Sequence, residues 1–200
     1  MNLSEFRVLF VAVVGILALL MASPALGRLL VLPKTEFFTE FWILDSNHMA
    51  ENYPFNVMRT ANYSVFLGLG NRLGYAAYYL VEVKFRNQSQ SAPNSFNRTS
   101  SSLPSLFNIT AFVADEAIWE YPLVFSFDYM YNEALSRVEF SSLNLNDFRL
   151  DITDYRVERD LNTGGFLGSL FFELWIYDAT ANDFGYHERS VGLWLNMTDS

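Results

Sequence analysis

Five Asn-x-Ser/Thr triplets after residue 35 are the residues whose type and spacing point most directly to chemistry. The triplet is the acceptor for N-linked glycosylation, in which a sugar is attached to an exposed Asn side chain. Asn87 and Asn97 are the acceptors that we expect first, because both lie in a segment rich in Ser and Asn. The predicted acceptors are Asn62, Asn87, Asn97, Asn108 and Asn196.

Residues suited to catalysis or metal binding are sparse. His48 and His187 are the only histidines and cysteine is absent, whereas a zinc site requires three or four such ligands. No serine lies in a Gly-x-Ser-x-Gly motif, and Gly164-Gly165 has turn residues around it in place of a strand and a helix. We therefore predict no catalytic residue, no cofactor and no metal site, and we predict that the chain is not an enzyme.

Aspartates gather at predicted turns, and carboxylate oxygens in loops are ligands for Ca²⁺. Their spacing does not fit the EF-hand pattern, so we interpret them as solvated turn and strand-edge residues. The residues are Asp147, Asp151, Asp154, Asp160, Asp178 and Asp183.

The charge balance excludes one class of partner. The chain of 200 residues has 13 basic and 22 acidic side chains, giving a net charge of −9. Nucleic-acid binding depends on Lys/Arg patches, so we predict no nucleic-acid partner. Because there is no cysteine, no disulfide can stabilise the fold, which must be held together by packing.

An uncharged apolar run occupies residues 8–26, between Arg7 and Arg28. About 20 apolar residues in a helix cross the hydrocarbon of a bilayer. The sequence thus predicts an N-terminal segment, residues 1–35, with a transmembrane helix that anchors the chain in the cell membrane, its C-terminal part extracytoplasmic. A cleaved signal peptide is the alternative, because Ala25-Leu26-Gly27 resembles a small-residue cleavage site.

Residues 36–200 show recurrent alternation of apolar and polar side chains, which is typical of strands. The pattern changes phase between Phe140 and Leu143, and again between Ile152 and Tyr155, so each place requires a bulge or a turn. The predicted strands are 37–44, 56–69 with a break, 75–85, 107–114, 119–128, 136–145, 148–158, 168–177 and 189–197.

Strands that follow one another without helices pair antiparallel and form sandwiches. We therefore predict an all-β fold, an antiparallel β-sandwich over residues 36–200 preceded by the one transmembrane helix. Residues 86–106 are rich in Ser and Asn and poor in apolar side chains, which predicts a long, exposed, disordered-like loop.

The phrase Phe-Thr-Glu-Phe-Trp-Ile-Leu at residues 38–44, with Ala-Glu-Asn-Tyr-Pro at 50–54, resembles the DUF1616 family of archaeal membrane proteins. Residues 64–71, 79–83, 120–125 and 189–195 resemble later strands of that family. Residues 45–49 depart from its pattern, residues 86–106 and about 129–165 look like insertions, and family members often carry several N-terminal helices. The resemblance implies an immunoglobulin-like outer domain in an archaeal cell envelope, and it implies no activity.

These observations predict a membrane-anchored cell-envelope module with a structural or binding role. Its partner would be another envelope or membrane protein, or a glycan stacked on one of the four tryptophans. One alternative is an accessory subunit of a membrane protein complex. The other is an extracytoplasmic hydrolase, which would require a concave pocket holding two carboxylates.

Overall fold

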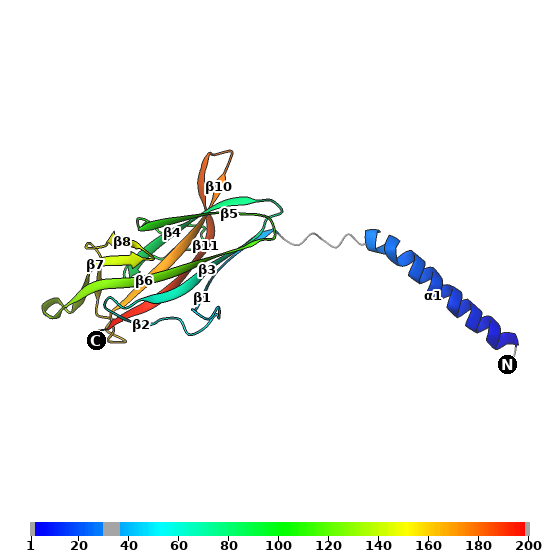
Figure 1. Ribbon diagram of the computed structural model, residues 1–200, viewed down its shortest axis with the longest axis horizontal. Coiled ribbons are helices and arrows are strands. Elements are labelled where there is room, and N and C mark those ends of the chain that lie inside the picture. Colours follow the sequence, from blue (N-terminus) through cyan, green and yellow to red (C-terminus); the bar gives the residue numbers. More distant parts are fainter. Residues whose placement is uncertain (1–2, 30–36, 199–200) are drawn as a thin grey trace. The chain divides into compact units, whose positions relative to one another are not determined.

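The computed structural model describes residues 3–29 and 37–198, which belong to two compact units, Met1–Glu36 and Phe37–Ser200. The first unit contains helix α1, Leu3–Leu29 (Figure 1). Within the described residues, no helix qualifies as long and apolar enough to cross a membrane, so the predicted transmembrane helix is not supported there. Residues 30–35 of the predicted N-terminal segment lie outside the described part of the chain.

The second unit is a two-layer β-sandwich over residues 37–198, which confirms the predicted sandwich architecture (Figure 1). A single 3₁₀ turn, η1 (Glu133–Leu135), interrupts the described strands. The strands are β1 Phe38–Leu44, β2 Asn56–Met58, β3 Tyr63–Arg72, β4 Ala77–Asn87, β5 Phe107–Val113, β6 Ile118–Asn132, β7 Arg137–Leu145, β8 Phe148–Asp151, β9 Arg156–Glu158, β10 Leu167–Asp178 and β11 Asp183–Thr198.

The two sheets are built from different strands of the chain. One has the order β1-β3-β6-β7-β8, with β9 also paired to β7, and the other has the order β2-β11-β10-β4-β5. All pairings are antiparallel except that of β2 with β11, which is parallel. The chain therefore crosses between the layers several times, so each sheet depends on strands that are distant in sequence.

The core lies between the layers and is rich in aromatic side chains. Phe85 from β4 packs against Phe127 of β6 and Phe140 of β7, with ring centres 5.0–5.6 Å apart within this trio, and all three are buried. Edge-to-face and tilted rings at such distances add to the free energy gained from apolar burial. The residues that alternate with these point away from the core, as period-2 patterning requires.

Both predicted phase changes are confirmed. The pairing of β6 with β7 shifts register where Asp128 pairs with Ser142 and Tyr129 with Phe140, which leaves Ser141 as the extra residue of a bulge. The second change lies between β8 and β9, where a turn separates two short strands.

Strand β11 begins six residues before the predicted strand. Its pairing with β10 shifts at the point where Leu174 pairs with Arg189 and Trp175 with Tyr186, so His187 and Glu188 are left without partners in the ladder. Glu188 has a positive φ of 56° there. The bulge contains two residues, so the strand keeps its parity. Phe184 and Tyr186 pair with Tyr177 and Trp175 and lie on the other face of the sheet from Val191, so the apolar alternation visible after residue 189 could not be followed back to Asp183.

The predicted long loop contains a buried residue. Residues 88–106, which we call the covering segment, include Ser101 at 5% exposure and a short bridge between Asn94 and Thr99. Phe96, by contrast, is 95% exposed. The segment therefore combines an exposed tip with a part that is packed against the sandwich.

Candidate functional site

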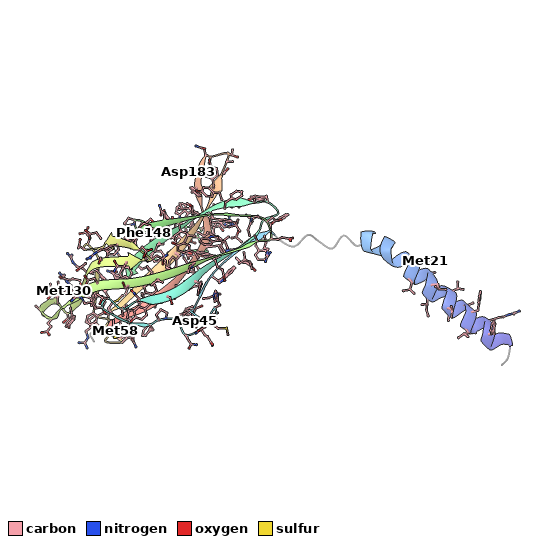
Figure 2. The ribbon with its side chains drawn as sticks, viewed as in Figure 1. Met21, Asp45, Met58, Met130, Phe148 and Asp183 are labelled. Atoms are coloured by element: carbon pink, nitrogen blue, oxygen red, sulfur yellow. The ribbon has the colours of Figure 1, made fainter. Side chains whose placement is uncertain are left out.

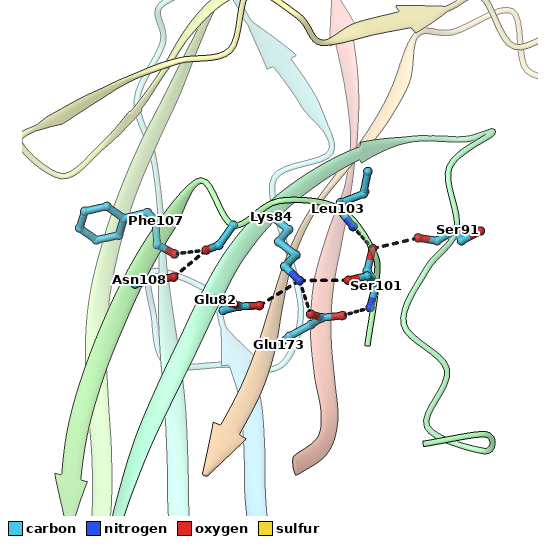
Figure 3. Close-up of polar contacts among 9 residues, drawn as sticks. Glu82, Lys84, Ser91, Ser101, Leu103, Phe107, Asn108 and Glu173 are labelled. Carbon is cyan, nitrogen blue, oxygen red and sulfur yellow. Dashed lines mark hydrogen bonds and ion pairs between the residues drawn. The ribbon is translucent and has the colours of Figure 1, made fainter. Parts of the chain in front are cut away.

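A buried cluster of charged side chains lies on the outer face of the five-stranded sheet (Figure 3). Lys84 and Glu82 belong to β4, and Glu173 lies on the neighbouring strand β10, directly opposite Glu82. The Lys84 ammonium lies 2.7 Å from a Glu173 oxygen and 2.9 Å from a Glu82 oxygen. Residues two apart on a strand share a face, which explains why Glu82 and Lys84 meet the same partner.

The covering segment closes over this cluster. The Ser101 amide donates a 2.6 Å hydrogen bond to Glu173, and Lys84 donates a 3.2 Å bond to the Ser101 carbonyl (Figure 3). The Ser101 hydroxyl donates to the carbonyl of Ser91 at 3.3 Å. The Glu173 side chain is fully buried and Lys84 is only 4% exposed. These bonds satisfy charges whose burial would otherwise be costly.

The cluster keeps its lysine charged. Burial alone would lower the pKa of Lys84, but the hydrogen bonds that its ammonium donates to Glu173 and Glu82, together with the negative charges of these carboxylates, outweigh burial and raise the pKa. The ammonium also lies 5.9 Å from the centre of the Trp175 ring. A charged lysine is a poor nucleophile, and a substrate could reach the carboxylates only if the covering segment moved. The arrangement is therefore suited to holding the segment on the sheet.

A second polar chain runs between the sheets near the start of β1. His187 lies 2.8 Å from the Thr39 hydroxyl, which is 3.2 Å from the Tyr79 hydroxyl, and Tyr79 donates to Asn71 at 3.1 Å. Burial, reinforced by the charge of Arg189, lowers the pKa of His187. An imidazole beside a hydroxyl is a pattern for nucleophile activation. Thr39 is only 3% exposed, however, so the chain serves better as a packed polar network.

An open groove of about 670 Å³ adjoins this network, lined by β1 residues together with Arg72 and Arg189. A smaller cavity of about 270 Å³ lies beside Tyr129, Tyr131 and Phe166. The Tyr129 hydroxyl lies 2.6 Å from the Val57 carbonyl oxygen, so it is engaged in joining β6 to β2. Neither space has two carboxylates in its lining, which is the arrangement that the hydrolase alternative requires.

The predicted glycosylation acceptors fall into two groups. Asn62, Asn97 and Asn108 are exposed. Asn87 and Asn196 are half-buried and their amide nitrogens donate hydrogen bonds, Asn87 to the Arg156 carbonyl at 3.1 Å and Asn196 to an Asn side chain at 3.0 Å. Because the sugar is attached through this nitrogen, the structure favours the exposed group. Whether any of the five is modified stays a prediction.

The aspartates at turns accept hydrogen bonds within their own turns. Asp151 accepts from the Thr153 amide at 3.0 Å, and Asp160 from the Thr163 amide at 2.6 Å. These backbone bonds lower the pKa of both carboxyl groups. Such Asx turns are a local structural role. Among the described residues, no group of three or more His, Asp or Glu side chains could hold a metal ion.

The remaining histidine and the tryptophans have intramolecular partners. The His48 ring stacks on Phe66 with ring centres 3.9 Å apart. Trp194, the most exposed tryptophan at 44%, lies beneath the Arg86 guanidinium, 4.6 Å from its ring centre. The other contacts are Trp42 over Gly68, Trp119 against Tyr121 and Trp175 against Tyr186. These contacts support a packing role.

Sequence reasoning missed the Lys84 cluster, although a signal was present. Glu173 is the one charge within the apolar stretch at residues 170–176, and Lys84 lies between apolar residues of β4. A single charge in such a stretch indicates a buried, paired group. The two residues are 89 positions apart, so nothing in the local pattern linked them.

Comparisons with known proteins leave the chain without an assigned family. No protein-family model and no curated protein matches it. Solved structures of a β-glucosidase from Listeria innocua, in complex with glucose and with gluconolactone, are similar at 9% sequence identity, with TM-scores of 0.33 and 0.34. The match covers 79% of this chain and only 16% of the β-glucosidase chain. Similarity at this level does not inform function.

Proposed function

We propose that the chain is a cell-envelope module, in which an N-terminal helix anchors an extracytoplasmic β-sandwich that binds or scaffolds another envelope component. The observation that carries this proposal is the exposed apolar surface of α1. Phe6, Val8 and Val11 are 59–71% exposed, and residues 8–21 contain no charge. Water does not favour a helix that is apolar all round, whereas lipid does.

Two observations support an immunoglobulin-like sandwich of the kind found in the DUF1616 family. The short strand β2 joins the second sheet by parallel pairing with the last strand, β11, while β1 pairs in the other sheet. The first two strands, β1 and β2, are thus divided between the two layers, which is consistent with immunoglobulin-like domains. The phrase at residues 38–44 forms β1, the first strand after the helix, as the family resemblance implies.

A binding or structural role is favoured over catalysis because the polar clusters are buried and already hydrogen bonded. Glu173 and Thr39 are buried and already hydrogen bonded, so neither presents a free reactive group at the surface. The exposed surface instead offers aromatic side chains and glycosylation triplets, which suit contact with proteins or glycans.

Membrane fractionation of the native source tests the proposal. The full chain should sediment with membranes, resist extraction with alkaline carbonate, and retain its N-terminal residues in the mature protein. A soluble protein whose mature N-terminus lies near Arg28 would contradict the anchor. Cross-linking in intact cells followed by mass spectrometry would then identify the envelope component that contacts the sandwich.

A further inference from the structure

We propose that one end of the sandwich rests on the interface of a lipid bilayer through six exposed aromatic side chains. At this end, which we call the junction end, β1, β4, β6 and β11 begin and β3, β5 and β10 finish. The inference rests on the proposed membrane anchor and extends it to the sandwich itself. The six side chains are Phe37, Phe38, Tyr75, Tyr78, Phe112 and Tyr177.

Exposed aromatic side chains are concentrated at the junction end. Within residues 37–198, eleven large aromatic side chains are exposed, and six of these belong to this group. Phe112 is 71% exposed, Phe37 60% and Tyr75 57%. Single exposed apolar residues are normal, but several gathered at one end of a domain indicate a contact surface.

The six residues come from both layers. Tyr78 lies directly opposite Phe112 across β4 and β5, and its ring centre is 6.2 Å from that of Tyr177 on β10. Phe38 belongs to β1 of the other sheet, where it pairs with Arg72. The aromatic rings therefore flank the end of the sandwich on two faces and do not form a stripe along one sheet.

Connectivity indicates what covers this surface. Residues 30–37 are all that separate the last residue of α1 from the first residue of β1, so the junction end is the part of the sandwich joined to the apolar helix. Tyrosine and other amphipathic rings are favoured at the level of lipid headgroups. At this end Asp115, Glu116, Asp178 and Asp183 outnumber Arg72 and Arg189, so an electrically neutral bilayer fits better than an anionic one.

The absence of cysteine permits a clean test with single spin labels. Ala114→Cys places a nitroxide at the junction end, and Ala134→Cys places one in η1, beyond the far end of β6. The 15 residues of β6 separate these ends by about 50 Å at about 3.3 Å per residue. Met130 marks that far region in Figure 2.

The full-length variants would be reconstituted in phosphatidylcholine vesicles, and the collision rates of each label with oxygen and with a water-soluble nickel chelate would be compared. The label at residue 114 should show several-fold more protection from the nickel chelate than the label at residue 134. Adding Tyr78→Ser and Phe112→Ser should abolish the difference, whereas Phe96→Ser, at the exposed tip of the covering segment, should not.

The outcomes separate this inference from the proposed function. If the chain does not float with vesicles, the anchor is refuted. If it floats but residues 114 and 134 are equally accessible, the anchor stands and the interface contact is overturned. Protection that requires anionic lipid and disappears at high salt would also overturn the proposal, because aromatic insertion into a neutral bilayer is insensitive to ionic strength.

Discussion

Replacing Glu173 by Gln should loosen the covering segment and destabilise the sandwich. The change keeps the volume but removes the charge that lies 2.7 Å from the Lys84 ammonium. Removing one partner of a buried ion pair costs about 3–5 kcal/mol. Because Glu82 still neutralises Lys84 at 2.9 Å, we expect the lower value, about 3 kcal/mol. For a domain of this size that corresponds to a fall in melting temperature of about 6–12 °C.

Two assays on the full chain would detect the change. Thermal unfolding gives the melting temperature, and limited trypsin digestion reports on the covering segment, because Arg98 in that segment is 76% exposed. Cleavage after Arg98 should become faster in Glu173→Gln, since Gln has one acceptor oxygen where the carboxylate has two, and it cannot accept from both the Ser101 amide and the Lys84 ammonium. The matched control is Glu139→Gln, which breaks a surface pair with Arg137 and should leave both readouts nearly unchanged.

If Glu173→Gln melted and was cleaved like the unmodified chain, the Glu173 carboxylate would not be holding the covering segment. A double-mutant cycle adds a second check. Lys84→Met combined with Glu173→Leu should be less destabilising than the sum of the two single changes, because the double variant leaves neither charge buried alone. Additive losses would show that the two side chains do not interact.

Three further predictions follow from the polar network, the triplets and the edge strand. Because the pKa of His187 is lowered in the folded state, stability should begin to fall as the pH drops below about 6.5, and in acid unfolding curves His187→Gln should remove this first part of the acid dependence while leaving the part due to carboxyl groups such as Asp151 and Asp160. Peptide mapping of the native protein should find more glycan at exposed Asn97 than at Asn87, whose amide nitrogen is hydrogen bonded. A Cβ added at Gly68 would lie 2.1 Å from the Trp42 ring, so Gly68→Ala should cost about 1–3 kcal/mol in urea unfolding, and much less in a Trp42→Ala background.

The strands could be predicted where apolar side chains alternate regularly with polar ones on each side of a bulge or turn. The inward row of β7 and its phase change at Ser141 were visible in the sequence because each side of the bulge has its own apolar row. The start of β11 was not visible, because Phe184 and Tyr186 alternate on the opposite parity from Val191. A bulge within a single strand looks the same as the end of the strand when only the apolar pattern is available.

The site could not be predicted because it depends on pairing between distant segments. Residues 88–106 lack the apolar content that forms a core, so composition indicated an exposed loop. The segment is held by hydrogen bonds at Ser101 to a charge pair from β4 and β10, and such contacts leave no periodic signal. The same limitation applies to Thr39 and His187, which are 148 residues apart.

Both polar clusters help to fix how segments of the sandwich are placed against one another, which apolar packing alone does not determine. Lys84 and Glu173 hold the covering segment on the outside of a sheet. At the junction end, Tyr79 of β4 is hydrogen bonded to Thr39 of β1 and Asn71 of β3, so it connects the two sheets. Polar groups that are satisfied in only one arrangement disfavour alternative registers, because any slip would leave them buried and unpaired. In a sandwich without disulfides, this is a physical reason for retaining charged and polar residues in buried positions, even though hydrophobic replacements of similar size could be as stable. Combined apolar replacement of Lys84 and Glu173 should therefore preserve stability while the covering segment becomes accessible to trypsin.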